Sequence, residues 1–165
     1  MNRRIFLAAF PAVLVAGCGF QLRRLEGIPF ASLYVDAPPN SAVAQHIIAS
    51  LKTNKATRLA ASATEAEAVL KIHSEARSKI ILSLSGAGRV TEYRLGLSMS
   101  YNVSGKNDRT LAAPEMIELS RDLIYDDAQL LAKSAEEGLL YRNMEVDATR
   151  RILRRLQSIK PGGGS

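Results

Sequence analysis

The sequence predicts an α+β fold in which two helices pack on one face of a mostly antiparallel, four-stranded sheet. Three observations carry this prediction. Apolar and polar side chains alternate at period two across three long central segments. Apolar residues recur at helical spacing in one segment before these strands and in one after them. Glycine, proline and asparagine separate the segments, which gives the element order β-α-β-β-β-α.

The first two elements are a short strand and a helix. Residues 33–35 form a brief apolar run that two prolines close. Ser41 and the asparagine before it are good helix caps, and four apolar residues then recur at helical spacing. We therefore expect a helix over 42–52. The polar, alanine-rich stretch 53–67 should be a loop with one weak strand near 57–61.

Three long strands follow. In the first, 70–84, the even positions are apolar or small and the odd positions are mostly charged, so the even side chains should face the helices. The second strand, 93–103, and the third, 117–125, place their apolar residues on odd positions. Glycine-containing turns join them into long hairpins. Pro114 indicates an edge or a bulge near the start of the third strand.

A long helix ends the predicted domain. Asp126 and Asp127 should cap its start, and arginines crowd its end, as the helix dipole favours. The stripe expected to be buried consists of Ala128, Leu131, Ala135, Leu139, Val146, Thr149, Ile152, Leu153 and Leu156.

The N-terminus has the pattern of a bacterial lipoprotein signal. A basic start precedes an apolar run that is too short to span a bilayer, and a Val-Ala-Gly-Cys exit ends at Cys18. The alternatives are an ordinary signal peptide with a chance cysteine, or a buried helix. We expect a signal peptide at 1–17, a lipidated terminus and tether at 18–32, a folded domain at 33–158 and a flexible tail at 159–165. Cys18 should carry N-palmitoyl and S-diacylglycerol groups, which anchor durably. Gly19, where an aspartate commonly signals retention in the inner membrane, favours the outer membrane.

The sequence lacks the groupings of catalytic residues that an enzyme would need. Cleavage before Cys18 leaves 148 residues with a net charge of +4, and the only thiol would be consumed by lipid. His46 and His73 have no serine or acidic partner at a recognised spacing, so they support neither a hydrolytic triad nor a metal site. The carboxylate pairs at 126–127 and 136–137 are interpreted as helix-start charges. We expect neither a cofactor nor a metal.

Basic residues are the remaining candidates for function. They occur near the first long hairpin and in the first turns of the last helix: Lys71, Arg77, Lys79, Arg89, Arg94 and Lys133. A solvated surface that keeps the protein soluble is one interpretation. Nucleic acid is disfavoured by export from the cytosol and by the lack of an exposed aromatic pair for base stacking. In the periplasm the abundant large anions are phospholipids and lipopolysaccharide, whose phosphates pair with lysine and arginine.

Several segments resemble the LptE family of lipopolysaccharide-assembly lipoproteins. They occur in the family's order along nearly the whole mature chain: Cys18-Gly19-Phe20-Gln21-Leu22-Arg23, Thr91-Glu92-Tyr93, Leu130-Leu131-Ala132-Lys133 and Arg151-Ile152-Leu153-Arg154-Arg155-Leu156.

The resemblance implies a non-enzymatic protein of the outer membrane that sits inside the β-barrel LptD, helps that barrel assemble and binds lipopolysaccharide. Family positions near the first hairpin turn and before the last helix bind the lipid. Lys133 matches the second by its flanking residues, and Arg89 lies a few residues after the first, with Lys79 and Arg94 as neighbouring candidates. The alternative is a general structural lipoprotein without lipid cargo. A third, weaker alternative is a nucleic-acid or envelope-stress adaptor.

Overall fold

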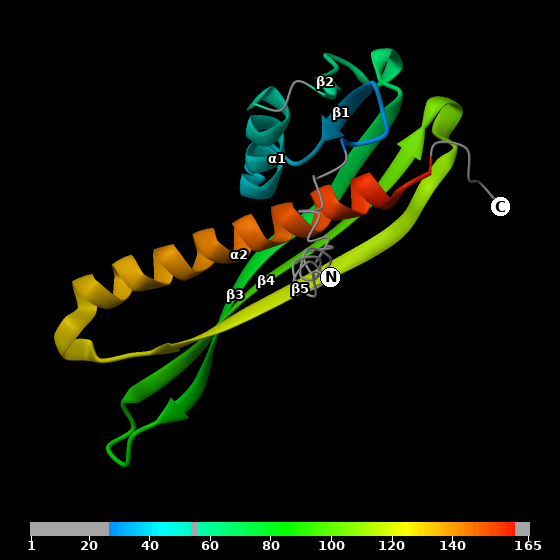
Figure 1. Cartoon of the computed structure of the whole chain (residues 1–165). Coiled ribbons are helices and arrows are strands. Elements are labelled where there is room, and N and C mark those ends of the chain that lie inside the picture. Colours follow the sequence, from blue (N-terminus) through cyan, green and yellow to red (C-terminus); the bar gives the residue numbers. More distant parts are fainter. Residues whose placement is uncertain (1–26, 54–55, 161–165) are drawn as a thin grey trace, which may run out of the picture.

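A long β-meander and a 29-residue helix that runs along it set the shape of this protein (Figure 1). The computed structural model describes residues 27–53 and 56–160, so the predicted signal peptide, Cys18 and the end of the predicted tail lie outside the described residues. The elements in chain order are β1 (Ser32–Asp36), α1 (Ala42–Thr53), β2 (Arg58–Leu59), η1 (Ala63–Glu65), β3 (Ala68–Leu84), β4 (Val90–Gly105), η2 (Lys106–Asp108), β5 (Thr110–Ile124), η3 (Asp127–Gln129) and α2 (Leu130–Ser158).

The sheet is mixed and has five strands, in the order β2-β1-β3-β4-β5. β3, β4 and β5 are antiparallel, whereas β1 pairs in parallel with both β2 and β3. The prediction of four mostly antiparallel strands was therefore close but not correct. The helix α1 lies between β1 and β2 in the chain, and such a crossover returns the chain parallel to its start. β2 has two residues and lies within the stretch 57–61, where a weak strand was expected, although the predicted sheet of four strands did not include it.

The two helices lie on the same face of the sheet, with α1 against α2 and α2 over β4 and β5 (Figure 1). The start of α1 is fixed as the sequence predicts, because the Ser41 hydroxyl accepts the backbone N–H of Ala44 at 3.0 Å. The Asp126 carboxylate likewise accepts the N–H of Ala128 at 3.0 Å, and η3 then leads into α2.

The core lies between this sheet face and the helices. On β4 the odd positions are buried as predicted, from Leu95 to Val103, and on β5 Ile117, Leu119 and Leu123 are buried with them. The helices contribute Val43, Ile47, Met144, Ala148 and Ile152, none of which is exposed to solvent. Removing this apolar surface from water is the main stabilising term of the fold.

A bulge in β3 overturns the predicted alternation of that strand. Leu70 and Ile72 are buried, as predicted. The register then shifts between Ile72 and Ser74, so that His73 is the extra residue. One inserted residue exchanges the two faces of everything that follows, because the side-chain period is two.

After the bulge, the odd positions of β3 lie on the helix-covered face. Glu75, Arg77 and Lys79 pair directly with the buried Met99, Leu97 and Leu95 of β4. The even positions, predicted to face in, lie on the uncovered face: Ser74, Ala76 and Ser78 pair with Ser100, Ser98 and Gly96. This uncovered face is therefore lined by small side chains.

The predicted buried stripe of the last helix is correct only in its second half. Thr149, Ile152 and Leu156 are buried, but Leu131 is 86 % exposed and Leu139 is 50 % exposed. The first turns of α2 diverge from the β3–β4 hairpin, so nothing covers their apolar side chains (Figure 1). Tyr141 and Met144, absent from the predicted stripe, begin the buried part instead.

Candidate functional site

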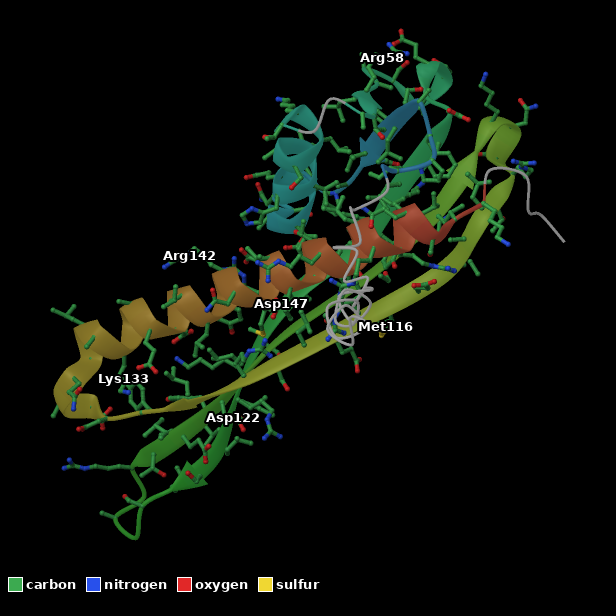
Figure 2. The ribbon with its side chains drawn as sticks, in the orientation of Figure 1. Arg58, Met116, Asp122, Lys133, Arg142 and Asp147 are labelled. Atoms are coloured by element: carbon green, nitrogen blue, oxygen red, sulfur yellow. The ribbon has the colours of Figure 1, made fainter. Side chains whose placement is uncertain are left out.

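Exposed apolar side chains gather at the end of the molecule where the β3–β4 hairpin turns and α2 begins (Figure 2). We call this the distal end, and define it by residues 79–94, the end of β5 from 122, and 125–139. Its exposed apolar residues are Ile80, Ile81, Leu82, Leu84, Ile124, Leu130, Leu131 and Leu139. In a soluble domain such a concentration of apolar surface marks an interaction site.

Lys79 joins the two layers at the distal end. Its Nζ donates to the Glu137 carboxylate of α2 at 2.6 Å and lies 4.3 Å from the centre of the Tyr93 ring. The Tyr93 and Tyr125 rings meet edge to face at 5.1 Å. The hydrogen bond to Glu137 raises the pKa of Lys79. Lys79 is therefore held in place by a carboxylate and aromatic rings, on the face opposite to the one predicted.

Arg94 lies on the uncovered face of the sheet. Its guanidinium binds both carboxylate oxygens of Asp122, at 2.7 Å and 3.0 Å. This fork raises the pKa of Arg94 and lowers the pKa of Asp122. Because β4 places it on the face opposite to Leu95, Arg94 does not share a cluster with Lys79.

Lys133 and Arg89 differ in their partners. The Lys133 Nζ donates to Glu136 at 2.9 Å, and its side chain is 17 % exposed. Arg89 is exposed at the hairpin turn, where its backbone closes a loop with Ser85. Among the described residues its guanidinium makes no ion pair. Of the four predicted cations, Arg89 alone is thus unpaired within the described chain.

Sequence reasoning missed two features of this end. The carboxylates Glu136 and Glu137, interpreted as helix-start charges, neutralise Lys133 and Lys79. The apolar surface of the hairpin and of the first turns of α2 was assigned to the core. No local signal separates this surface from core, because Leu131 has the same helical spacing as the buried residues later in the helix.

Each of the two histidines contacts a neighbouring polar side chain of the fold. His73 is the bulged residue, and its Nε2 lies 2.8 Å from Asn102 Oδ1. His46 Nε2 lies 3.9 Å from the carboxylate of Glu145, which is 3 % exposed. In the described part of the chain, no group of histidine, cysteine and carboxylate side chains could hold a metal ion.

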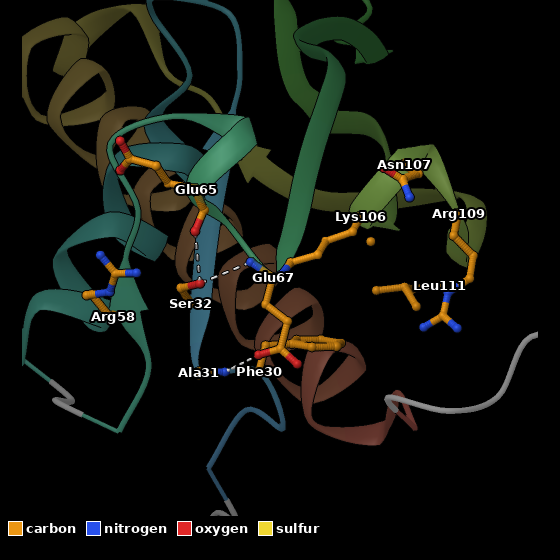
Figure 3. Close-up of a pocket in the computed structure, with 11 residues that line it drawn as sticks. Phe30, Ala31, Ser32, Arg58, Glu65, Glu67, Lys106, Asn107, Arg109 and Leu111 are labelled. Carbon is orange, nitrogen blue, oxygen red and sulfur yellow. Dashed lines mark hydrogen bonds between the residues drawn. The ribbon is translucent and has the colours of Figure 1, made fainter.

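A cavity of about 670 Å³ lies at the opposite, proximal end, around Phe30, Glu67 and Lys106 (Figure 3). Its polar groups serve the fold. The Glu67 carboxylate accepts the Ala31 N–H at 2.7 Å, and the Ser32 hydroxyl accepts the Glu67 N–H at 3.0 Å. Two carboxylates, Glu65 and Glu67, offset most of the charge of the three cations in this lining, Arg58, Lys106 and Arg109.

None of the helices in the described residues is long and apolar enough to span a bilayer.

The model of a known family, described as lipopolysaccharide-assembly (LptE), matches residues 30–156, which is most of the described domain. The chain belongs to the LptE family. LptE proteins are non-enzymatic and have no known cofactor, in agreement with the sequence-based expectation. This chain is accordingly a lipoprotein of lipopolysaccharide assembly in the cell envelope.

Relatives extend this likeness in sequence and in fold. The LPS-assembly lipoprotein LptE of Photorhabdus laumondii is 26% identical, over 96% of this chain and 88% of its own. An uncharacterized lipoprotein B from Nitrosomonas europaea, solved by NMR, is 35% identical with a TM-score of 0.74, over 85% of this chain and 91% of its own. The rare lipoprotein B of Shewanella oneidensis is 27% identical with a TM-score of 0.66, over 77% and 94%.

Proposed function

We propose that this LptE-family protein is anchored in the outer membrane through acyl chains on Cys18, plugs the lumen of the β-barrel LptD, and binds lipopolysaccharide at its distal end. One observation carries the lipid-binding role. Exposed apolar side chains and the cations Arg89 and Lys133 belong to the same end of the molecule. Lipopolysaccharide is an amphiphile that presents phosphates beside acyl chains, so it matches both kinds of side chain.

The distal cations offer different degrees of access to phosphate. Arg89 makes no ion pair within the described chain, so a lipid phosphate can bind it without displacing a carboxylate. Lys133 must exchange Glu136 for phosphate. The Lys133 side chain is also only 17 % exposed, so phosphate reaches it less readily than it reaches Arg89. Lys79 is paired with Glu137, and Arg94 is paired with Asp122. These two cations therefore stabilise the structure of the distal end, and Arg89 and Lys133 contact the lipid phosphates first.

The shape and the uncovered sheet face support the role of a plug. β3 has 17 residues, so the meander is about 55 Å long. The uncovered face carries small polar side chains, among them Ser74, Ser98 and Ser100. The inner wall of an outer-membrane barrel is polar, so this polar face of the sheet is chemically suited to pack against that wall.

Reversing the charges of Arg89 and Lys133 tests the lipid-binding role. The variant R89E/K133E should bind immobilised lipopolysaccharide at least tenfold more weakly and keep its thermal midpoint. The matched control is R58E/R142E, because both of those arginines are exposed and lie outside the distal end (Figure 2). An equal loss in the control, or unchanged binding in R89E/K133E, contradicts the site.

Purification from outer membranes tests the partner. A large, heat-modifiable β-barrel should co-purify with the tagged full chain. If no barrel is recovered, the alternative of a structural lipoprotein without lipid cargo is favoured. Incorporation of labelled palmitate into the wild type but not into C18A tests the anchor separately.

A further inference from the structure

A groove between the two helices carries both apolar and cationic side chains. Two cavities of about 500 Å³ and 400 Å³ share Ser50, Arg150 and Leu153 in their walls, so they adjoin each other along the two helices and together make up this groove. The remaining walls come from α1, α2 and the chain that enters the domain: His46, Ala49, Leu51, Thr53, Val146, Thr149, Arg154, Gln157 and Ile28.

The arginines of this groove are weakly neutralised. The Arg150 side chain is 66 % exposed and lies 3.6 Å from Asp147, whose carboxylate is already bound by Arg121 at 2.8 Å. Arg154 is exposed and makes no ion pair among the described residues. By contrast, Arg155 is paired with Glu115 at 2.6 Å. Two arginines and no carboxylate line the groove, whereas two carboxylates offset most of the cationic charge in the lining of the proximal cavity around Phe30.

The position of the groove relative to the anchor singles it out. Ile28, which lies in its wall, is ten residues after Cys18. Ten extended residues span at most about 35 Å. If Cys18 is lipidated as proposed, the membrane surface is within this distance of the groove. The distal end lies at the far end of strands about 55 Å long.

We propose that this groove docks on anionic phospholipid headgroups of the leaflet in which Cys18 is anchored. Arg150 and Arg154 bind lipid phosphates, while Ile28 and Leu153 lie toward the apolar boundary of the bilayer. The lipid anchor and this contact together give the protein two attachments, which fix the orientation of its long axis. The inference rests on the proposed anchor but not on the proposed binding of lipopolysaccharide.

Vesicle binding by the unlipidated chain from residue 19 tests the contact. This chain keeps every buried residue of the core, which extends from Phe30 to Ile159. It should sediment with phosphatidylcholine vesicles that contain phosphatidylglycerol, and not with phosphatidylcholine alone. Each basic residue near an anionic surface contributes a factor of about five in binding, so R150E/R154E should lose at least tenfold.

The distal variant R89E/K133E is the matched control, since it reverses the same number of charges elsewhere on the molecule. It should keep vesicle binding while losing lipopolysaccharide binding, and R150E/R154E should do the reverse. Equal binding to both kinds of vesicle, or equal loss in the two variants, overturns the proposal. Because this test uses the unlipidated chain, its outcome does not depend on whether palmitate is incorporated at Cys18.

The chain has no tryptophan, so a single introduced tryptophan can report where the protein contacts the vesicle. In the variant Ile28→Trp, indole emission should shift to shorter wavelength when phosphatidylglycerol vesicles are added. Inorganic phosphate should produce no shift, which distinguishes a bilayer from a free anion. The control Met116→Trp, at a residue that is 68 % exposed and lies outside both the groove and the distal end, should not respond to these vesicles. A shift in Met116→Trp alone overturns the assignment.

Discussion

The proximal and distal halves of this protein use the same strands and the same long helix in different ways. In the proximal half α1 and the second half of α2 cover the sheet, and side chains such as Leu70, Val103 and Ile152 are fully buried. In the distal half the first turns of α2 diverge from the hairpin, and ion pairs and rings bridge the layers instead (Figure 1). Stability therefore resides mainly in one half and the candidate binding surface in the other.

Two apolar residues of α2 should show the largest difference between the halves. Ile152→Ala removes a side chain with no exposure and should lower the free energy of unfolding by about 3 kcal/mol. Leu131→Ala, at a residue 86 % exposed, should change it by less than about 0.5 kcal/mol. Urea unfolding followed by circular dichroism measures both. Similar values for the two variants would contradict the division into halves.

A smaller difference should separate two arginine–carboxylate pairs. Arg77 pairs with Glu145, which is 3 % exposed and sits within the layers. Arg77→Ala leaves that carboxylate buried, with His46 as its remaining basic partner in the described part of the chain. It should lower the free energy of unfolding by about 3 kcal/mol or somewhat less, since Arg77 itself is half exposed.

The distal counterpart, Arg94→Ala, breaks an exposed pair and should lower the free energy of unfolding much less than Arg77→Ala does. The urea midpoints of the two variants, measured at the same pH and at low salt, test whether Arg77→Ala is the more destabilising substitution. An Arg94→Ala variant as destabilised as Arg77→Ala would mean that the distal bridges hold the fold as strongly as the proximal core does.

High pH should destabilise the proximal half and low pH the distal half, and both effects should be smaller than those of the substitutions above. Burial, followed by the hydrogen bond to Glu115, raises the pKa of Tyr101, so its stabilising effect is complete below about pH 10 and is lost as the pH rises further. Arg94 lowers the pKa of Asp122, so that contribution is present above about pH 4 and is lost as the pH falls.

Free energies of unfolding measured across pH separate these two effects. Tyr101→Phe should flatten the alkaline limb only, and Asp122→Asn should flatten the acid limb only. An alkaline limb that is unchanged in Tyr101→Phe would show that another group governs it.

Local pattern was sufficient wherever one face of an element is uniformly covered. On β4 every odd position from Leu95 to Val103 packs under the helices, so simple alternation predicted the core correctly. Caps were predictable for a similar reason. Ser41 and Asp126 bond to backbone N–H groups two or three residues away, and such contacts require no distant partner.

Pattern failed where distant segments set the geometry. The bulge at His73 exchanged the faces of β3, so Lys79 lies on the helix-covered face and is bound by Glu137. The exposed apolar end could not be distinguished from core, because Leu131 has the same helical spacing as a buried residue. The groove around Arg150 also depends on α1 lying beside α2, which neither helix encodes by itself.

The sequence by itself determined the elements, most of the core and the family of this protein, because periodicity, capping and short motifs are local properties of the chain. Only the tertiary structure decided which cations are paired, which apolar residues are uncovered, and how β1, β2 and β3 align. These properties depend on which distant surfaces meet. A single inserted residue in a strand, or a helix that diverges from its sheet, changes which surfaces pack together without changing the local sequence pattern.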